Sequence, residues 1–254
     1  MTTRSELRQQ GEAMRARLFG AEQPQPEAAP GFRDFMSEAE FGIVWSRPGM
    51  ELKDRMLCTL AALGSVQRLQ VLRRYVGAAL NIGVTPTAIQ EVLIQIGIYA
   101  GFAASEEALG AAAEVFAKHH INIHPQAPRD DSLETLTVRG TELMNALHRE
   151  DGSKGYAAPG NPVTGALYPV AIQYGYGEIW FRPGLEHKQR VLISVASFTA
   201  LKLESQIKKF GQAALNLGAT REEVIEAVIQ TAPFSGFAPA LNALGVLSEV
   251  LRPV

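Results

Sequence analysis

The sequence predicts an all-α protein made of two related helical domains in tandem. The stretch from Phe41 to Phe116 occurs again, without a gap, from Tyr176 to Leu251, and more than a third of the aligned positions are identical. A fixed-period match of this length indicates a duplicated unit. No stretch alternates apolar and polar residues between turn signals, as a half-buried strand would. We expect two domains, at residues 1–120 and 121–254.

Composition excludes several classes of function. Apolar residues make up 46% of the 254 residues, which is enough for two cores, and the net charge is −2. Without a basic patch, we expect no nucleic-acid partner and no anionic membrane partner. The charged N-terminus has no apolar signal core and no apolar run is long enough to span a bilayer, so we expect a cytoplasmic protein. Cys58 is the single cysteine, so neither an intrachain disulfide nor a C-x-x-C redox pair can form.

The helices of the first half can be placed from periodicity and capping residues. Ser5 is the expected N-cap of the first helix, Thr85 caps another that begins with Pro86, and Pro48-Gly49 marks a turn. Leu72, Val76 and their neighbours keep the spacing of one buried helix face. The expected helices cover residues 5–19, 51–63, 69–82, 86–99 and 103–118.

The second half repeats this plan. Residues 133–148 correspond to the first helix of the chain, because Gly140 falls where Gly11 does in the first half. Residues 119–132 are expected to form the connecting loop. The segment 150–165 is rich in glycine and proline, and we interpret it as a loop that could act as a flap over a site.

The order of these motifs resembles the carboxymuconolactone decarboxylase family, part of the alkyl hydroperoxidase D-like superfamily. Each half carries W-x-RPG followed by an arginine, then a helix that ends AALNxG, then GFA and ALG. The resemblance covers nearly the whole chain, once per half. It implies compact helical domains without a cofactor. It also implies a homo-oligomer, with a homotrimer forming a pseudo-hexamer of domains.

The acid groups that this family uses are missing from both halves. The resemblance places its Glu–His pair at Val71 and Tyr75 in the first half, and at Gln206 and Phe210 in the second. Loss of CO₂ next to a carbonyl leaves an enolate-like carbanion that a nearby acid must protonate, and histidine suits this role because of its pKa. The five histidines lie outside these two helices, at positions 119, 120, 124, 148 and 187.

Tyr75 and Glu91 are therefore the candidate catalytic residues. Tyr75 can donate a proton or a hydrogen bond, or it can simply fill a helix face, as Phe210 would. Glu91 lies one helical turn from Gln95, and Glu226 and Gln230 repeat this pair. These four side chains could bind a substrate or form a structural hydrogen-bond network.

Residues around the repeated Pro-Gly turn are candidates for substrate binding. Arg47 and Arg182 each offer a planar fork for a carboxylate, and Trp45 and Trp180 each offer a flat apolar wall. Alternatively, they hold the turn against a neighbouring helix. Tyr99 joins this group because its counterpart, Phe234, has no hydroxyl.

Other polar groups are weaker candidates for a functional site. Arg55 is expected to pair with Glu51, and Arg190 with Glu186, at i,i+4 on a helix face. His187 is an alternative proton carrier. The histidines at 119, 120 and 124 lie in a loop without matching carboxylates, so we expect no metal site.

Three hypotheses follow from these residues. The first is a cofactor-free enzyme that acts on a small lactone, organic acid or polyketide-like carbonyl compound by decarboxylation, isomerisation or cyclisation, with a small molecule as its substrate. The second is an inactive ligand-binding or scaffold protein. The third, a thiol peroxidase of the hydroperoxidase D type, lacks its cysteine pair.

Overall fold

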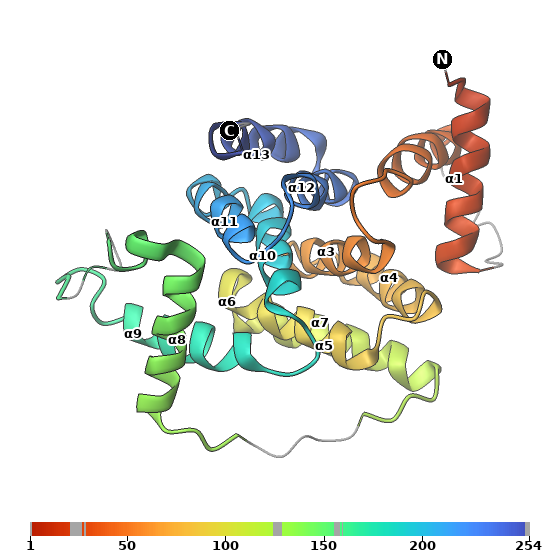
Figure 1. Ribbon diagram of the computed structural model, residues 1–254. Coiled ribbons are helices and arrows are strands. Elements are labelled where there is room, and N and C mark those ends of the chain that lie inside the picture. Colours follow the sequence, from red (N-terminus) through yellow and green to blue (C-terminus); the bar gives the residue numbers. More distant parts are fainter. Residues whose placement is uncertain are drawn as a thin grey trace.

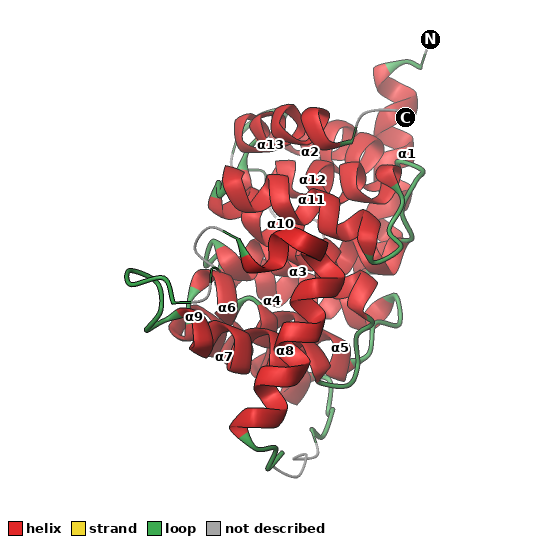
Figure 2. Ribbon diagram, turned by 60° about the vertical axis from the view of Figure 1, so that its left-hand side comes forward, coloured by secondary structure: helices red, strands yellow, loops and turns green. Residues whose placement is uncertain are grey.

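The computed structural model describes residues 2–20, 27, 29–123, 129–154, 158 and 160–251. Within these residues the chain is helical and forms no strand (Figure 1; Figure 2). This confirms the predicted all-α fold. No helix in the described part of the chain is both long and apolar enough to cross a membrane.

The first half contains a set of helices that closely follows the prediction. Thr85 accepts a hydrogen bond from the N–H of Ala88, as an N-cap does, and Pro86 follows at the first helical position. The elements are α1 (Arg4–Phe19), α2 (Phe32–Met36), η1 (Ser37–Trp45), α3 (Leu52–Ser65), α4 (Leu69–Asn81), α5 (Pro86–Gln95), α6 (Gly97–Ala100) and α7 (Phe102–Lys118).

The second half repeats the order, with α8 as the counterpart of α1. The elements are α8 (Leu133–His148), η2 (Arg149–Ser153), α9 (Tyr168–Val170), η4 (Ala171–Glu178), η5 (Ile179–Phe181), α10 (His187–Leu201), α11 (Glu204–Asn216), α12 (Arg221–Ser235) and α13 (Phe237–Val250). In Figure 1, α1 and α8 lie on opposite sides of the molecule, while α3 and α10 meet near its centre.

Two details differ from the sequence-based expectation, and a third prediction lies partly outside the described residues. The N-cap of α1 is Thr3 and not Ser5, because Thr3 forms a reciprocal capping box with Glu6. The helix expected at 86–99 is divided into α5 and α6. The candidate flap at 150–165 includes residues 155–157 and 159, which lie outside the described residues.

The periodicity did not reveal η1, a wide helix of the π type that η4 repeats in the second half. Glycine allows η1 to pack closely on α1: a Cβ on Gly11 would lie 1.8 Å from the Ser37 carbonyl oxygen, and one on Gly42 would lie 2.3 Å from that of Leu7. Gly140 and Gly177 make the same kind of crossing between α8 and η4. The duplication therefore preserved the way each π-type helix is held, and such helices often occur at functional sites.

The two halves share their cores across the contact between α3 and α10. Ile193 of α10 is buried in the core of the first half, and Cys58, its counterpart on α3, is buried in that of the second. Each half thus contributes the same position of its helix to the core of the other half, as is typical of two related units that meet through the same surface.

Candidate functional site

A cavity of about 440 Å³ lies in the first half, and the second half supplies one of its walls. Its size is within the usual range for small-molecule sites. Apolar and polar side chains line it together: Arg15, Glu27, Phe32, Arg33, Met36, Glu40, Phe41, Leu63, Arg68, Val71, Arg74, Tyr75, Pro233 and Phe234. Tyr75 and Val71, the positions at which the family resemblance places an acid pair, both face this cavity.

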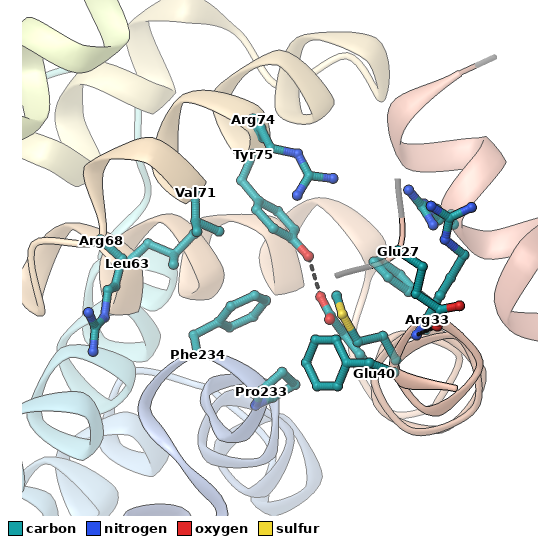
Figure 3. Close-up of a pocket in the computed structure, with 14 residues that line it drawn as sticks. Glu27, Arg33, Glu40, Leu63, Arg68, Val71, Arg74, Tyr75, Pro233 and Phe234 are labelled. Carbon is teal, nitrogen blue, oxygen red and sulfur yellow. Dashed lines mark hydrogen bonds between the residues drawn. The ribbon is translucent and has the colours of Figure 1, made fainter. Parts of the chain in front are cut away.

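Glu40 and Tyr75 form the polar centre of the cavity (Figure 3). The Tyr75 hydroxyl donates a short hydrogen bond to the Glu40 carboxylate. Tyr75 comes from α4, on the buried stripe that the sequence pattern predicts, while Glu40 comes from η1. Aromatic rings hold Tyr75 in place: Trp45 stacks on it at 5.9 Å between centroids, and Phe234 meets it edge-on at 5.1 Å.

Burial changes how both groups ionise. It raises the pKa of the Glu40 carboxyl from 4.5 to about 6, although the hydrogen bond from Tyr75 and the charges of Arg74 and Arg15 offset part of this effect. Burial, followed by the negative charge of Glu40, raises the pKa of Tyr75 well above its ordinary value. Near neutral pH, Tyr75 therefore remains a donor, while Glu40 exchanges its proton in the range useful for acid–base chemistry.

Positive charge surrounds this pair. Four arginines line the cavity against two glutamates. In the described part of the chain the guanidinium groups of Arg15, Arg33 and Arg68 have no ion-pair partner, while that of Arg74 lies over the Phe19 ring at 5.2 Å. A carboxylate or another small anion would be attracted here, because arginine forks match its geometry.

The corresponding region of the second half is filled by aromatic rings. Phe198 replaces Leu63, Phe210 replaces Tyr75 and Gly175 replaces Glu40. The Phe198 ring contacts those of Phe210 and Tyr99 at 4.8 and 4.5 Å between centroids. His148 packs edge-on against Phe210, and burial lowers its pKa to about 4, which leaves the imidazole neutral at pH 7. The Glu–Tyr pair is therefore specific to the first half.

The other predicted carboxylates lie in two ion-pair networks that cross between the halves. Arg47 pairs with Glu226 at 2.8 Å, and Arg182 pairs with Glu91 at 2.9 Å. The side chains of Glu91 and Glu226 are each 2% exposed, and neither residue lines the cavity. The Gln95 amide donates to the carbonyl of Arg190 and to Ser194, while that of Gln230 donates to Thr59. The structure thus places these residues at the contact between the halves.

The expected i,i+4 ion pairs are wrong. Arg55 pairs with Glu226 at 2.9 Å and Arg190 pairs with Glu91 at 3.0 Å, in each case across the two halves. Glu186 instead caps the start of α10. Helical spacing predicts only the neighbours of a residue within its own helix. In the folded protein, each of these buried arginines lies closer to a glutamate of the other half.

Tyr99, Trp180 and His187 lie on the second-half side of the contact. The Tyr99 hydroxyl is 2.7 Å from that of Ser194, and the ring of His187 packs on Phe181 at 5.2 Å. Trp180 is 1% exposed in the second core. Cys58 is buried and burial raises its pKa, so its thiol is unsuited to peroxide chemistry. Of the loop histidines, His124 lies outside the described residues.

Sequence reasoning missed Glu40, although a signal was present. When the duplicated alignment is extended back by one position from Phe41, Glu40 falls opposite Gly175. A titratable residue that only one copy carries is not explained by the shared fold. Comparison of the two halves at this position would therefore have identified it.

The comparisons with known proteins agree with this architecture. The model of the carboxymuconolactone decarboxylase family matches the chain twice, at residues 30–114 and 166–249. A solved structure from Burkholderia xenovorans, provisionally named a gamma-carboxymuconolactone decarboxylase subunit, covers 98% of both chains with a TM-score of 0.58. Its sequence identity is 20%, so the likeness concerns the fold alone.

Two curated relatives are decarboxylases by name. The 4-carboxymuconolactone decarboxylase of Acinetobacter baylyi is 40% identical over 85 residues, which are 34% of this chain. The nitrosuccinic acid decarboxylase of Metarhizium robertsii is 29% identical over 91 residues, or 36% of this chain. The chain matches 63% and 64% of the length of these relatives, a little under two thirds.

Proposed function

This chain belongs to the carboxymuconolactone decarboxylase family, and on that premise we propose that its first half is a cofactor-free site for proton transfer to a small carbonyl acid or lactone. The favoured reaction is decarboxylation. Isomerisation or cyclisation of a polyketide-like carbonyl compound would use the same acid–base step. The observation that carries the proposal is the Glu40–Tyr75 pair inside a cavity rimmed by arginines.

The chemistry follows from the two protonation states of Glu40. Arginines at the rim bind the substrate carboxylate, and the bond between this carboxylate and the adjacent carbon breaks. The electron pair stays on that carbon, delocalised onto the neighbouring carbonyl as an enolate, and CO₂ leaves. Protonated Glu40 then gives its proton to the carbon and becomes a carboxylate, which water reprotonates. Tyr75 donates a hydrogen bond to Glu40 throughout and so fixes the direction of its carboxyl group.

This proposal assigns to Glu40 the acid role for which Glu91 is the sequence candidate. Glu91 is held by two arginines at the contact between the halves. Glu40 is held by a neutral hydroxyl and faces the cavity. Of these two carboxylates, only Glu40 lies where a molecule in the cavity could reach it.

The test is release of CO₂ or formation of product from a panel of small acids. The panel includes 4-carboxymuconolactone and nitrosuccinic acid, the compounds named for the relatives, together with simple β-keto acids. Glu40→Gln is expected to lower the rate by about 100-fold to 10,000-fold, since it removes the transferable proton. Tyr75→Phe is expected to lower it less, by about tenfold, because it removes only the positioning hydrogen bond.

Glu38→Gln is the matched control, because Glu38 lies on the same helix but pairs with Arg4 and Arg8 outside the cavity. It should turn over at the wild-type rate. Equal rates for Glu40→Gln and wild type would remove the acid role from Glu40. Tight binding of the panel without any turnover would instead favour the second hypothesis, a ligand-binding protein.

A further inference from the structure

The cavity of the first half needs the second half to be complete. Pro233 and Phe234, near the end of α12, form one wall, while Glu40 on η1 meets the hydroxyl end of the Tyr75 ring (Figure 3). Phe234 contacts that ring at 5.1 Å between centroids. The shape of the site therefore depends on how α12 is held against η1, although these elements are far apart in the sequence.

One buried arginine connects the two elements. The guanidinium group of Arg55, on α3, donates to the carbonyl oxygens of Arg47 and Pro48 at 2.9 and 2.8 Å, in the turn that directly follows η1. The same group donates to Glu226 at 2.9 Å and to Gln230 at 3.3 Å, both on α12. Its side chain is 1% exposed, so water cannot take the place of any of these partners.

We propose that Arg55 is a positioning residue for this cavity: it fixes the end of η1 and the body of α12 together, so that Phe234 closes the cavity over Tyr75 and Glu40. The inference rests on the proposed function in naming this cavity as the site. Phe234 lies about two helical turns beyond Glu226 on α12, and Glu40 lies on η1, which ends at Trp45 just before the turn that contains Arg47. A shift at the guanidinium group would therefore move both walls of the cavity relative to each other.

The duplication provides a built-in comparison. Arg190 is the counterpart of Arg55 and makes the equivalent contacts with Glu91, Gln95 and the carbonyl oxygen of Arg182. Its side chain is fully buried, as that of Arg55 is. Arg190, however, holds α5 against the turn after η5, and neither it nor its partners line the cavity. Neither arginine lines the cavity itself, but only Arg55 holds α12, the helix that supplies Pro233 and Phe234 to the cavity wall.

The experiment compares Arg55→Lys with Arg190→Lys. Lysine keeps the charge but loses the planar fork that reaches several acceptors at once. The melting temperature measures any general loss of stability, and ¹³C NMR titration of the Glu40 carboxyl measures the pKa of this group in the cavity. Both variants should melt at similarly lowered temperatures. Only in Arg55→Lys should the pKa of Glu40 fall from about 6 toward 4.5, because a displaced Phe234 wall admits water.

A binding measurement supplies an independent readout. The probe is 2-naphthoate, a flat apolar carboxylate, titrated by calorimetry. Arg55→Lys should weaken its binding about tenfold or more, and Arg190→Lys should stay within about twofold of wild type, since small misplacements are costly in a shaped site. Equal Glu40 titration curves in the two variants would overturn the proposal, as would an equal loss of probe affinity.

One further variant removes the remaining ambiguity. If Arg55→Lys does not fold, Glu226→Asp retracts the carboxylate while keeping its charge, and the same fall in the pKa of Glu40 is expected; an unchanged pKa would reject the positioning role. Because the titration requires no substrate, it is decisive even if wild-type protein turns nothing over. Absence of turnover would count against the proposed function, whereas matching titrations in the two lysine variants would count against Arg55.

Discussion

At the scale of single residues, the balance between burial and hydrogen bonding at Glu40 sets the pH dependence of the site. The active form in the proposed reaction is the protonated carboxyl. We expect the rate to fall as pH rises through about 6, and this limb should disappear in Glu40→Gln. A pH profile of kcat/KM, which reports ionisation of the free protein, checks this. A rate that rises through the same range would contradict the acid role.

The same group should make folding stability depend on pH. The pKa of Glu40 is about 6 in the folded protein and 4.5 is its ordinary value, so the folded state binds the proton more tightly. The contribution of Glu40 to the free energy of unfolding is fully present below pH 4.5. It is lost as the pH rises through 6, and the loss amounts to at most about 2 kcal/mol. Urea unfolding of wild type and Glu40→Gln between pH 4.5 and 7 measures the difference, which should shrink to zero if Glu40 is not buried in solution.

Leu63 lines the cavity, and we expect its size to keep the cavity open. The second half has Phe198 at this position, in contact with two other rings. Leu63→Phe should fill the cavity and weaken 2-naphthoate binding about tenfold, while costing less than about 1 kcal/mol in stability because the ring has space to enter. Leu60→Phe is the control: Leu60 is fully buried on the same helix and away from the cavity, so overpacking should cost about 1–3 kcal/mol.

At the scale of elements, the glycine crossing between α1 and η1 places Glu40. A Cβ on Gly42 would lie 2.3 Å from the Leu7 carbonyl oxygen, so the two backbones must separate to admit one. We expect Gly42→Ala to lose about 1–3 kcal/mol of stability and to reduce turnover, because η1 carries Glu40. Gly110→Ala, on α7 with nothing within 4 Å of the new Cβ, should be neutral or stabilising. Equal behaviour of the two variants in thermal melts would refute this account.

At the scale of the whole molecule, the reciprocal ion pairs and shared cores predict that the two halves unfold together. Trp45 lies in the first core and Trp180 in the second, each 1% exposed. In Trp45→Phe and Trp180→Phe, the remaining tryptophan reports one half at a time. In each variant, the urea midpoint measured by tryptophan fluorescence should equal the midpoint measured by circular dichroism, because all of the helices should unfold in the same transition. A fluorescence transition that precedes loss of half the helix signal would show independent domains.

The homotrimer stays a prediction at this scale, as do the domain limits of 1–120 and 121–254. Exposed apolar side chains occur at matching places in both halves, such as Phe102 and Phe237 at the starts of α7 and α13. Light scattering would measure the assembly as a multiple of the 27.5 kDa chain.

Much of this structure could be predicted, and the site residues show where prediction stopped. The buried stripe on residues 69–82 and the cap at Thr85 were readable because helix periodicity and capping involve neighbours in sequence. Tyr75 was found by its place on that stripe. Glu40 was not found, because it lies on a π-type helix, whose side-chain spacing the usual 3.6-residue pattern does not describe.

The sequence by itself determined that the protein is helical, that it is duplicated, and that both halves lack an imidazole at the position expected for the family. These properties follow from local pattern and from identity between two stretches of one chain. Only the tertiary structure decided that Glu91 and Glu226 pair with arginines of the opposite half, and that Glu40 meets Tyr75 inside a cavity walled by Phe234. The physical reason is that such contacts join residues 35 to 179 positions apart, and no local pattern encodes which buried charge will find which partner.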